Sequence, residues 1–157
     1  MTDELPVYSA ADIDPIGLDV PTFTNDEAVD LGLVAVQTIR DAGKNLAVRI
    51  VLGDDVPFVA KLGRTGPGND PWLAGKAAVV ARFGEPSLRV RRTHEEAGTP
   101  FDQRDDVDHA THKAHGGSIP IRVAGELVGS ITMSGEPDVV DHQVCAEAVR
   151  RYLASRG

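Results

Sequence analysis

The sequence has a single cysteine, no long apolar run and no motif that specifies a reaction by itself. With Cys145 alone, no internal disulfide forms, which is typical of proteins in a reducing compartment. No stretch approaches the ~18 apolar residues that a membrane-spanning helix needs. The first residues carry acid where a secretory signal carries base, and they lack its apolar centre. We therefore expect a cytoplasmic protein that binds no membrane.

The sequence also has fewer basic than acidic residues, 16 against 24. Its net charge is -8 and its pI is near 5.0, which argues against nucleic acid as the main partner because phosphate binding needs a basic surface. One basic cluster (Arg89, Arg91 and Arg92) is followed directly by Glu95 and Glu96. This mixed charge pattern predicts a solvated face.

The length of 157 residues is typical of one domain with an ordinary core. Residues 1–22 are acidic and interrupted by Pro6, Pro15 and Pro21, so we expect an N-terminal acidic extension. Residues 23–157 then form a single domain.

Periodic apolar residues predict four helices. Thr24 and Glu27 match a capping box, and the helix that follows spans about 18 residues and stops at Gly43. Asp70 and Pro71 open a second helix, whose apolar stripe contains Trp72, Lys76, Val79, Val80 and Phe83. A short helix over Leu88–Ala97 and a last helix from Asp138 complete the set.

Alternating and apolar runs predict two pairs of strands. Residues 46–52 and 56–62 form one pair, and Pro57 directs its second strand to an edge because proline donates no ladder hydrogen bond. Ile119–Val123 and Leu127–Met133 form a hairpin, bounded by glycines on both sides. Short turns between neighbours favour an antiparallel sheet with helices packed on it, an α+β fold of two layers.

Four segments resemble the haem-degrading, HbpS-like family, and they are closest to its uncharacterised cytoplasmic branch. They are His115–Ile121 (HGGSIPI), Gly129–Gly135 (GSITMSG), the Asp141-His142 pair and Asn69–Lys76 (NDPWLAGK). The resemblance covers residues 24–153. It implies a profilin-like layout, with an antiparallel sheet of about five strands flanked by helices. An arginine-rich tract after Ser87 stands where this branch has aromatic residues.

The resemblance also implies homo-oligomers and a small anionic or tetrapyrrole ligand, with haem as the cofactor if there is one. Three functions remain open: ligand binding, haem breakdown by an enzyme, and a non-enzymatic role in assembly or partner binding. Covalent catalysis has little support because Ser118, Ser130 and Ser134 lie outside a nucleophile elbow. Cys145 lies beside the apolar stripe of the last helix, which predicts a buried thiol.

The candidate ligand site lies at the glycine-bounded end of the hairpin. Backbone amides of Gly116 and Gly117 are candidates to hold an anionic group, and glycine there also serves a close backbone approach. The resemblance brings His142 towards this end, together with His115. Lys76, within an apolar stripe, either extends its ammonium to solvent or pairs with a ligand carboxylate.

A histidine triplet gives a second candidate site. His109, His112 and His115 are spaced so that on a helix all three come to one side, and imidazoles suit zinc, nickel, copper or iron. No His-Glu-x-x-His or cysteine-rich pattern accompanies them. The triplet is therefore either a metal or haem-iron site or a pH-sensitive polar surface.

Overall fold

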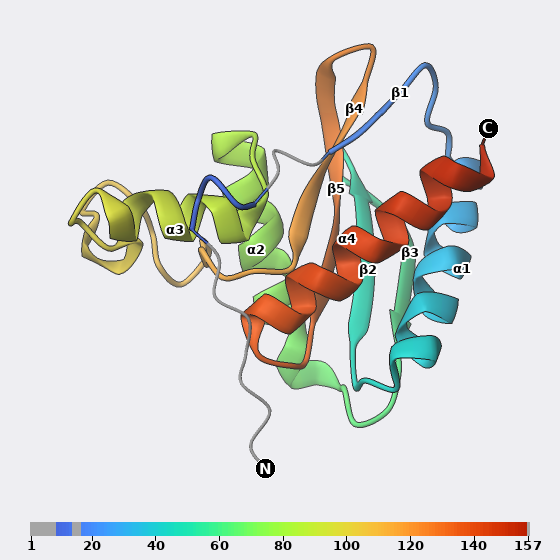
Figure 1. Ribbon diagram of the computed structural model, residues 1–157, viewed down its shortest axis with the longest axis horizontal. Helices are drawn as coiled ribbons and strands as arrows, with labels where there is room; N and C mark the ends of the chain where they lie inside the picture. The colour runs from blue at the N-terminus through green and yellow to red at the C-terminus, as the bar shows by residue number, and fades with distance from the viewer. Residues whose placement is uncertain (1–8, 14–16, 157) are drawn as a thin grey trace.

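The computed structural model describes residues 9–13 and 17–156 as five strands and four α-helices (Figure 1). In chain order the elements are β1 (Leu18–Val20), α1 (Asn25–Ala42), β2 (Ala47–Leu52), β3 (Asp55–Lys61), α2 (Asp70–Phe83), α3 (Ser87–Glu96), β4 (Ser118–Val123), β5 (Glu126–Ser134) and α4 (Asp138–Ser155). Short 3₁₀ turns at Pro67–Asn69 and Phe101–Gln103 flank α2 and α3. The α+β prediction is confirmed, and so are all four predicted helices.

The strands form one sheet in the order β1-β4-β5-β2-β3. The predicted hairpin and the first strand pair are antiparallel, and β3 lies at an edge as Pro57 predicted. The expectation of a wholly antiparallel sheet is wrong, because β1 pairs parallel with β4. Leu18 of β1 is fully buried, so the boundary predicted after residue 22 falls inside the folded unit. The rest of the predicted extension, residues 1–8 and 14–16, lies outside the described residues.

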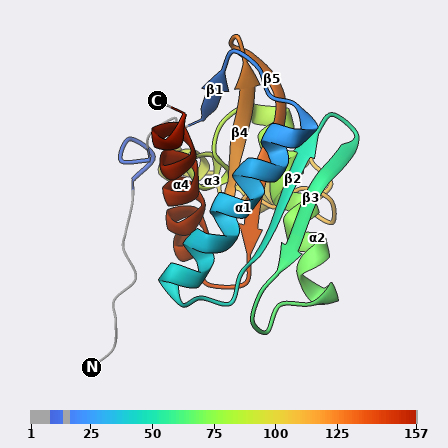
Figure 2. The ribbon, with the colours of Figure 1, turned by 90° about the vertical axis from the view of Figure 1, so that its right-hand side faces the viewer.

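Helices cover both faces of the sheet. α1 and α4 pack on one face, whereas α2 and α3 lie on the other (Figures 1 and 2). α1 begins with the predicted capping box, in which the Thr24 hydroxyl accepts from the Glu27 amide, and it ends at the left-handed Gly43. Among the helices of the described chain, none combines the length and apolar run of a membrane span.

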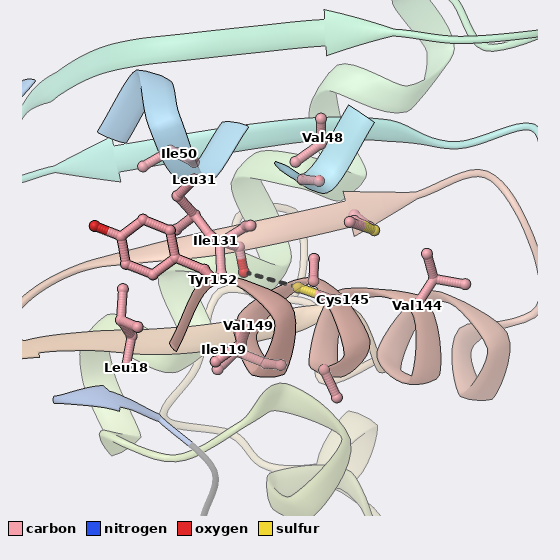
Figure 3. Close-up of a cluster of buried hydrophobic side chains, with 14 of the residues drawn as sticks. Leu18, Leu31, Val48, Ile50, Ile119, Ile131, Val144, Cys145, Val149 and Tyr152 are labelled. Carbon is pink, nitrogen blue, oxygen red and sulfur yellow. Dashed lines mark hydrogen bonds between the residues drawn. The ribbon is translucent and has the colours of Figure 1, made fainter. Parts of the chain in front are cut away.

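The apolar core fills the space between the sheet and the α1–α4 layer. Figure 3 shows Ile50, Ile119 and Ile131 of the sheet meeting Tyr152 and Cys145 of α4. The Cys145 thiol donates to the Ile131 carbonyl at 3.6 Å, and burial raises its pKa, which confirms the predicted inert thiol. On the other face of the sheet the buried side chains include four small polar ones, namely Ser118, Ser130, Thr132 and Ser134.

Gly32 allows α1 to approach β3 closely. A Cβ atom built there would lie 2.4 Å from the ring of Phe58. Alanine in a helix normally gains roughly 0.5–1 kcal/mol over glycine. We predict the opposite sign for Gly32→Ala, a loss of about 1–3 kcal/mol in the free energy of unfolding, because the ring must move.

Urea denaturation measures this change. Gly68→Ala is the control, because a Cβ atom there has no neighbour within 4 Å and the variant should match or slightly exceed the wild type. A Gly32→Ala protein as stable as its parent would show that Phe58 is loosely packed.

Candidate functional site

The candidate site lies at the end of the sheet where β4 begins and β5 ends. Ser118 of β4 pairs with Thr132 of β5, so the glycines at the two ends of the hairpin come together as predicted. The N-terminal part of α2 and the start of α4 lie beside this end (Figure 1). The chain between α3 and β4 covers it from a third side.

Two adjoining cavities occupy this region. The first, of about 250 Å³, is lined by Trp72, Arg91, Glu95, Pro100, Phe101, Asp102, His109, His112, Lys113, Ala114 and His115. The second, of about 280 Å³, is lined by Asn69, Trp72, Lys76, His115, Ser134, Gly135, Glu136, Asp138 and Asp141. Trp72 and His115 line both, and their rings meet edge to face with centroids 5.0 Å apart. This ring pair is the wall between the cavities.

The surroundings of His115 favour the neutral form of its imidazole. Burial lowers its pKa below the ordinary 6.5, and the nearby charges of Arg91, Lys76 and Lys113 act in the same direction. Asp138 opposes the shift. A neutral imidazole in a cavity wall is able to accept a hydrogen bond, donate one or ligate a metal.

The predicted anion-binding amide of Gly116 already has an anionic partner. It donates to a carboxylate oxygen of Asp138 at 3.0 Å, and Arg91 donates to the same oxygen at 2.5 Å. Burial acts to raise the pKa of Asp138, but the bonds from Gly116 and Arg91 lower it. A Cβ atom on Gly116 would lie 2.3 Å from the Asp138 carbonyl oxygen, so this contact requires glycine. The chain therefore supplies its own carboxylate here.

Lys76 does not extend into solvent. Its ammonium donates to Asp141 at 2.8 Å and to the Met133 carbonyl at 3.0 Å, and both charged side chains are at most 3% exposed. The other carboxylate oxygen of Asp141 accepts from the Glu136 amide at 2.9 Å. Burial raises the pKa of Asp141 from 3.8 to about 6, although Lys76 counteracts this. The amine is therefore committed to an internal ion pair at the cavity floor.

Gly117 lies against this ion pair. A Cβ atom there would be 2.3 Å from the Met133 carbonyl oxygen and 3.0 Å from the Lys76 nitrogen, and the φ of +134° is one that other residues rarely adopt. Gly117 thus serves the close approach that the sequence offered as an alternative to ligand binding.

His142 lies apart from the other candidates. Its neighbour Asp141 lines the second cavity, whereas His142 lines neither cavity. The imidazole is 7% exposed, and burial lowers its pKa to about 4. Adjacent helix residues point apart, so the two members of the Asp-His pair reach different surroundings.

The histidine triplet comes together in the first cavity but not on a helix. Asp108–Thr111 form a turn, and the chain from His112 to Gly117 is irregular, so the helical premise is wrong. His109 donates to the Arg104 carbonyl at 2.8 Å, and His112 lies 2.9 Å from the Thr111 hydroxyl. Within the described residues, no three His, Cys, Asp or Glu side chains are close enough to hold a metal ion. The metal prediction gains no geometric support.

Three residues of the site were not predicted. Trp72 belongs to a quoted family motif, but periodicity placed it in an apolar stripe, and it is in fact 38% exposed. The prediction of a wholly solvated basic cluster is wrong for Arg91, which is half-buried against Asp138. Lys113 lies 4.6 Å from the centre of the Trp72 ring and makes no ion pair within the described part of the chain.

Comparisons with known proteins identify a family, sequence relatives and solved structures of similar fold. The model of the family "Haem degrading protein HbpS-like" matches residues 23–150. A UPF0303 protein of Streptomyces coelicolor is 39% identical over 132 residues, which is 83% of this chain and 84% of that protein. The crystal structure of the Ybr137w protein is similar in fold, with a TM-score of 0.80 and 22% identity over 88% of this chain and 82% of the other. The PduOC:heme complex has a TM-score of 0.68 and 16% identity, with 82% and 94% covered.

We predict that Lys76→Met will destabilise the protein by roughly 3–5 kcal/mol at pH 8, because it leaves the Asp141 carboxylate buried without a countercharge. The loss should shrink at pH 5. A carboxyl group whose pKa is raised on folding stabilises the fold at low pH, and this contribution is lost as pH rises through the folded pKa. That pKa is about 6 with Lys76 present, and it must be higher without it.

Chemical denaturation at both pH values measures the effect. Lys61→Met is the matched control, because Lys61 pairs with Asp70 at 2.9 Å on the surface and should cost at most about 1 kcal/mol. Equal losses for the two variants at pH 8 would contradict the structural role of the buried pair.

We also predict that His142→Gln will flatten the dependence of stability on pH. A histidine whose pKa is lowered on folding adds its full contribution to the free energy of unfolding at pH values above its unfolded pKa of 6.5. That contribution is lost as the pH falls towards the folded pKa of about 4. The wild type should lose up to about 3 kcal/mol more than the variant between pH 7 and pH 4. Parallel stability curves would show that His142 is protonated without cost.

Proposed function

The chain belongs to the family of HbpS-like haem-degrading proteins, and on that premise we propose that it is a ligand-binding protein whose site is the cavity pair around Trp72 and His115. The ligand class that suits this site is a flat molecule with an acidic group. Tetrapyrroles such as haem are the largest members of that class.

The observation that supports the proposal is that three chemically different side chains, Trp72, His115 and Lys113, lie together in the lining of the first cavity. The Trp72 ring offers an apolar face, His115 a neutral imidazole, and Lys113 an ammonium without an ion-pair partner in the described chain. Small-molecule sites combine apolar walls with a few convergent polar groups in this way. Asp102 and Glu95 also line the first cavity, so we expect the acidic group of the ligand to lie at Lys113 instead.

The chemistry of these residues suits haem, but the cavities that they line are small for it. His115 would be the iron ligand, Trp72 would contact the macrocycle, and Lys113 would pair with a propionate. Iron held by a histidine supplies redox and oxygen chemistry. Each cavity, however, is below the ~300 Å³ lower end for drug-sized ligands, so haem requires both cavities together and a displaced Trp72–His115 wall. A smaller aromatic acid needs no such movement.

Haem breakdown remains the alternative function, favoured by the family description alone. It differs from binding by its requirement for a reductant and by loss of the bound pigment. Homo-oligomerisation and a cytoplasmic location stay predictions from the sequence; light scattering and cell fractionation test them.

We predict that haem, titrated into the purified protein, gives a shifted Soret band and quenches the fluorescence of Trp72, the only tryptophan in the chain. His115→Gln should weaken haem binding by about tenfold or more, since a metal–ligand bond is lost. His94→Gln, at a histidine that lines neither cavity, is the control and should bind as the wild type does.

A parallel titration with benzoate, read from the same fluorescence, tests the smaller ligand class. Lys113→Met should weaken it, whereas Lys44→Met, on the exposed turn after α1, should not. An unchanged Soret band at micromolar haem refutes the tetrapyrrole version, and no response to either compound refutes the proposed site. Bleaching of bound haem on addition of ascorbate would favour the enzyme.

A further inference from the structure

A third cavity lies on the α2 face of the sheet and shares no lining residue with the two described above. Its volume is about 430 Å³, larger than either of them and within the ~300–1,000 Å³ range of small-molecule sites. Its lining consists of Ala74, Ala77, Ala78 and Ala81 of α2, and of Arg49, Val51, Gly53, Leu127, Val128, Gly129 and Ser130 from the strands and the β2–β3 turn. We call it the α2 groove.

Short side chains on the helix wall keep this groove open. The helix side consists of alanines, which reach too short a distance to fill the space above the sheet. On the sheet side, Gly53, Gly129 and Ser130 add little side-chain volume beside Arg49, Val51, Leu127 and Val128. The result is an apolar recess between α2 and the strands β2 and β5.

Among the residues that the structure describes, Arg49 is the one charged residue that lines the α2 groove. It lies on β2, where it pairs with Val59 of β3 and Thr132 of β5. Its neighbour Ile50 faces the α1–α4 core, so alternation along the strand directs Arg49 to the α2 side. Its side chain makes no hydrogen bond or ion pair within the described residues, and no acidic residue lines the groove.

This isolation sets Arg49 apart from other half-buried arginines of the protein. Arg91 and Arg104 each bind an aspartate carboxylate. A guanidinium that is partly withdrawn from water in an apolar recess is stabilised by an anion that supplies the missing hydrogen bonds. The groove therefore has a positive end, apolar walls and no internal counterion.

We propose that the α2 groove is a second ligand site, which binds an amphipathic organic acid. The carboxylate of the ligand lies on Arg49, and its hydrocarbon part lies along Ala74, Ala78 and Ala81. Charge complementarity selects an acid over a neutral or basic amphiphile. A second copy of the chain is the less favoured occupant, because the recess has the volume of a small ligand.

Titration of the full chain with decanoate tests the proposal, with decanol as the uncharged probe. Both are measured by displacement of the fluorescent acid anilinonaphthalene sulfonate. Arg49→Met keeps the aliphatic stem and should weaken decanoate binding by about tenfold or more, with decanol affected far less. Ala78→Leu fills the recess and should abolish both. Arg64→Met, on an exposed loop, is the matched control and should leave both unchanged.

Three outcomes overturn the proposal. Decanoate that does not bind at millimolar concentration removes the ligand class, and equal binding to the wild type and Arg49→Met removes the anchor. Light scattering that shows a wild-type oligomer which Ala78→Leu dissociates would assign the groove to a second copy. Haem and benzoate should bind to Arg49→Met as they bind to the wild type. A result that refutes the α2 groove therefore leaves the ligand site at Trp72 and His115 untouched, and the reverse also holds.

Discussion

The buried ion pair of Lys76 and Asp141 is the contact on which the cavity end of the molecule depends. The ion pair joins Lys76 of α2 to Asp141 of α4. The same ammonium also donates a hydrogen bond to the Met133 carbonyl of β5. Buried charges are tolerated only where hydrogen bonds replace the lost water. Here the Glu136 amide binds the remaining carboxylate oxygen, so the start of α4 is positioned by the same group that neutralises Lys76.

From this contact the rest of the site follows. With α4 held in place, the Asp138 carboxylate accepts hydrogen bonds from both the Gly116 amide and Arg91. The Gly116 amide is therefore not available to bind the anionic group of a ligand. The glycines that looked like ligand-binding amides are instead the positions where backbone must approach α4 and Lys76 most closely. What remains accessible is the wall formed by Trp72, His115 and Lys113.

Local patterns were sufficient for most of the fold. The capping box at Thr24, the glycine stop at Gly43 and the glycine-bounded hairpin all depend on residues near one another in the chain, so the sequence predicted them. β1 was missed because three residues show no period, and its pairing with β4 is remote in sequence. The histidine spacing suggested a helix, but the Asp108 side chain accepts from the Ala110 amide and stabilises a turn.

The site was predicted less fully because its chemistry is set by which face of each helix meets the sheet. Lys76 and Asp141 are single charges in two separate apolar stripes, and only the packing of both helices on the sheet shows that they neutralise each other. Arg49 is the opposite case. Its strand was predicted, yet an unpaired arginine is recognisable only when every neighbouring element is known to lack a carboxylate. The α2 groove therefore lies on the face where the alanines of α2 leave space, whereas the α1–α4 face is filled by the apolar core.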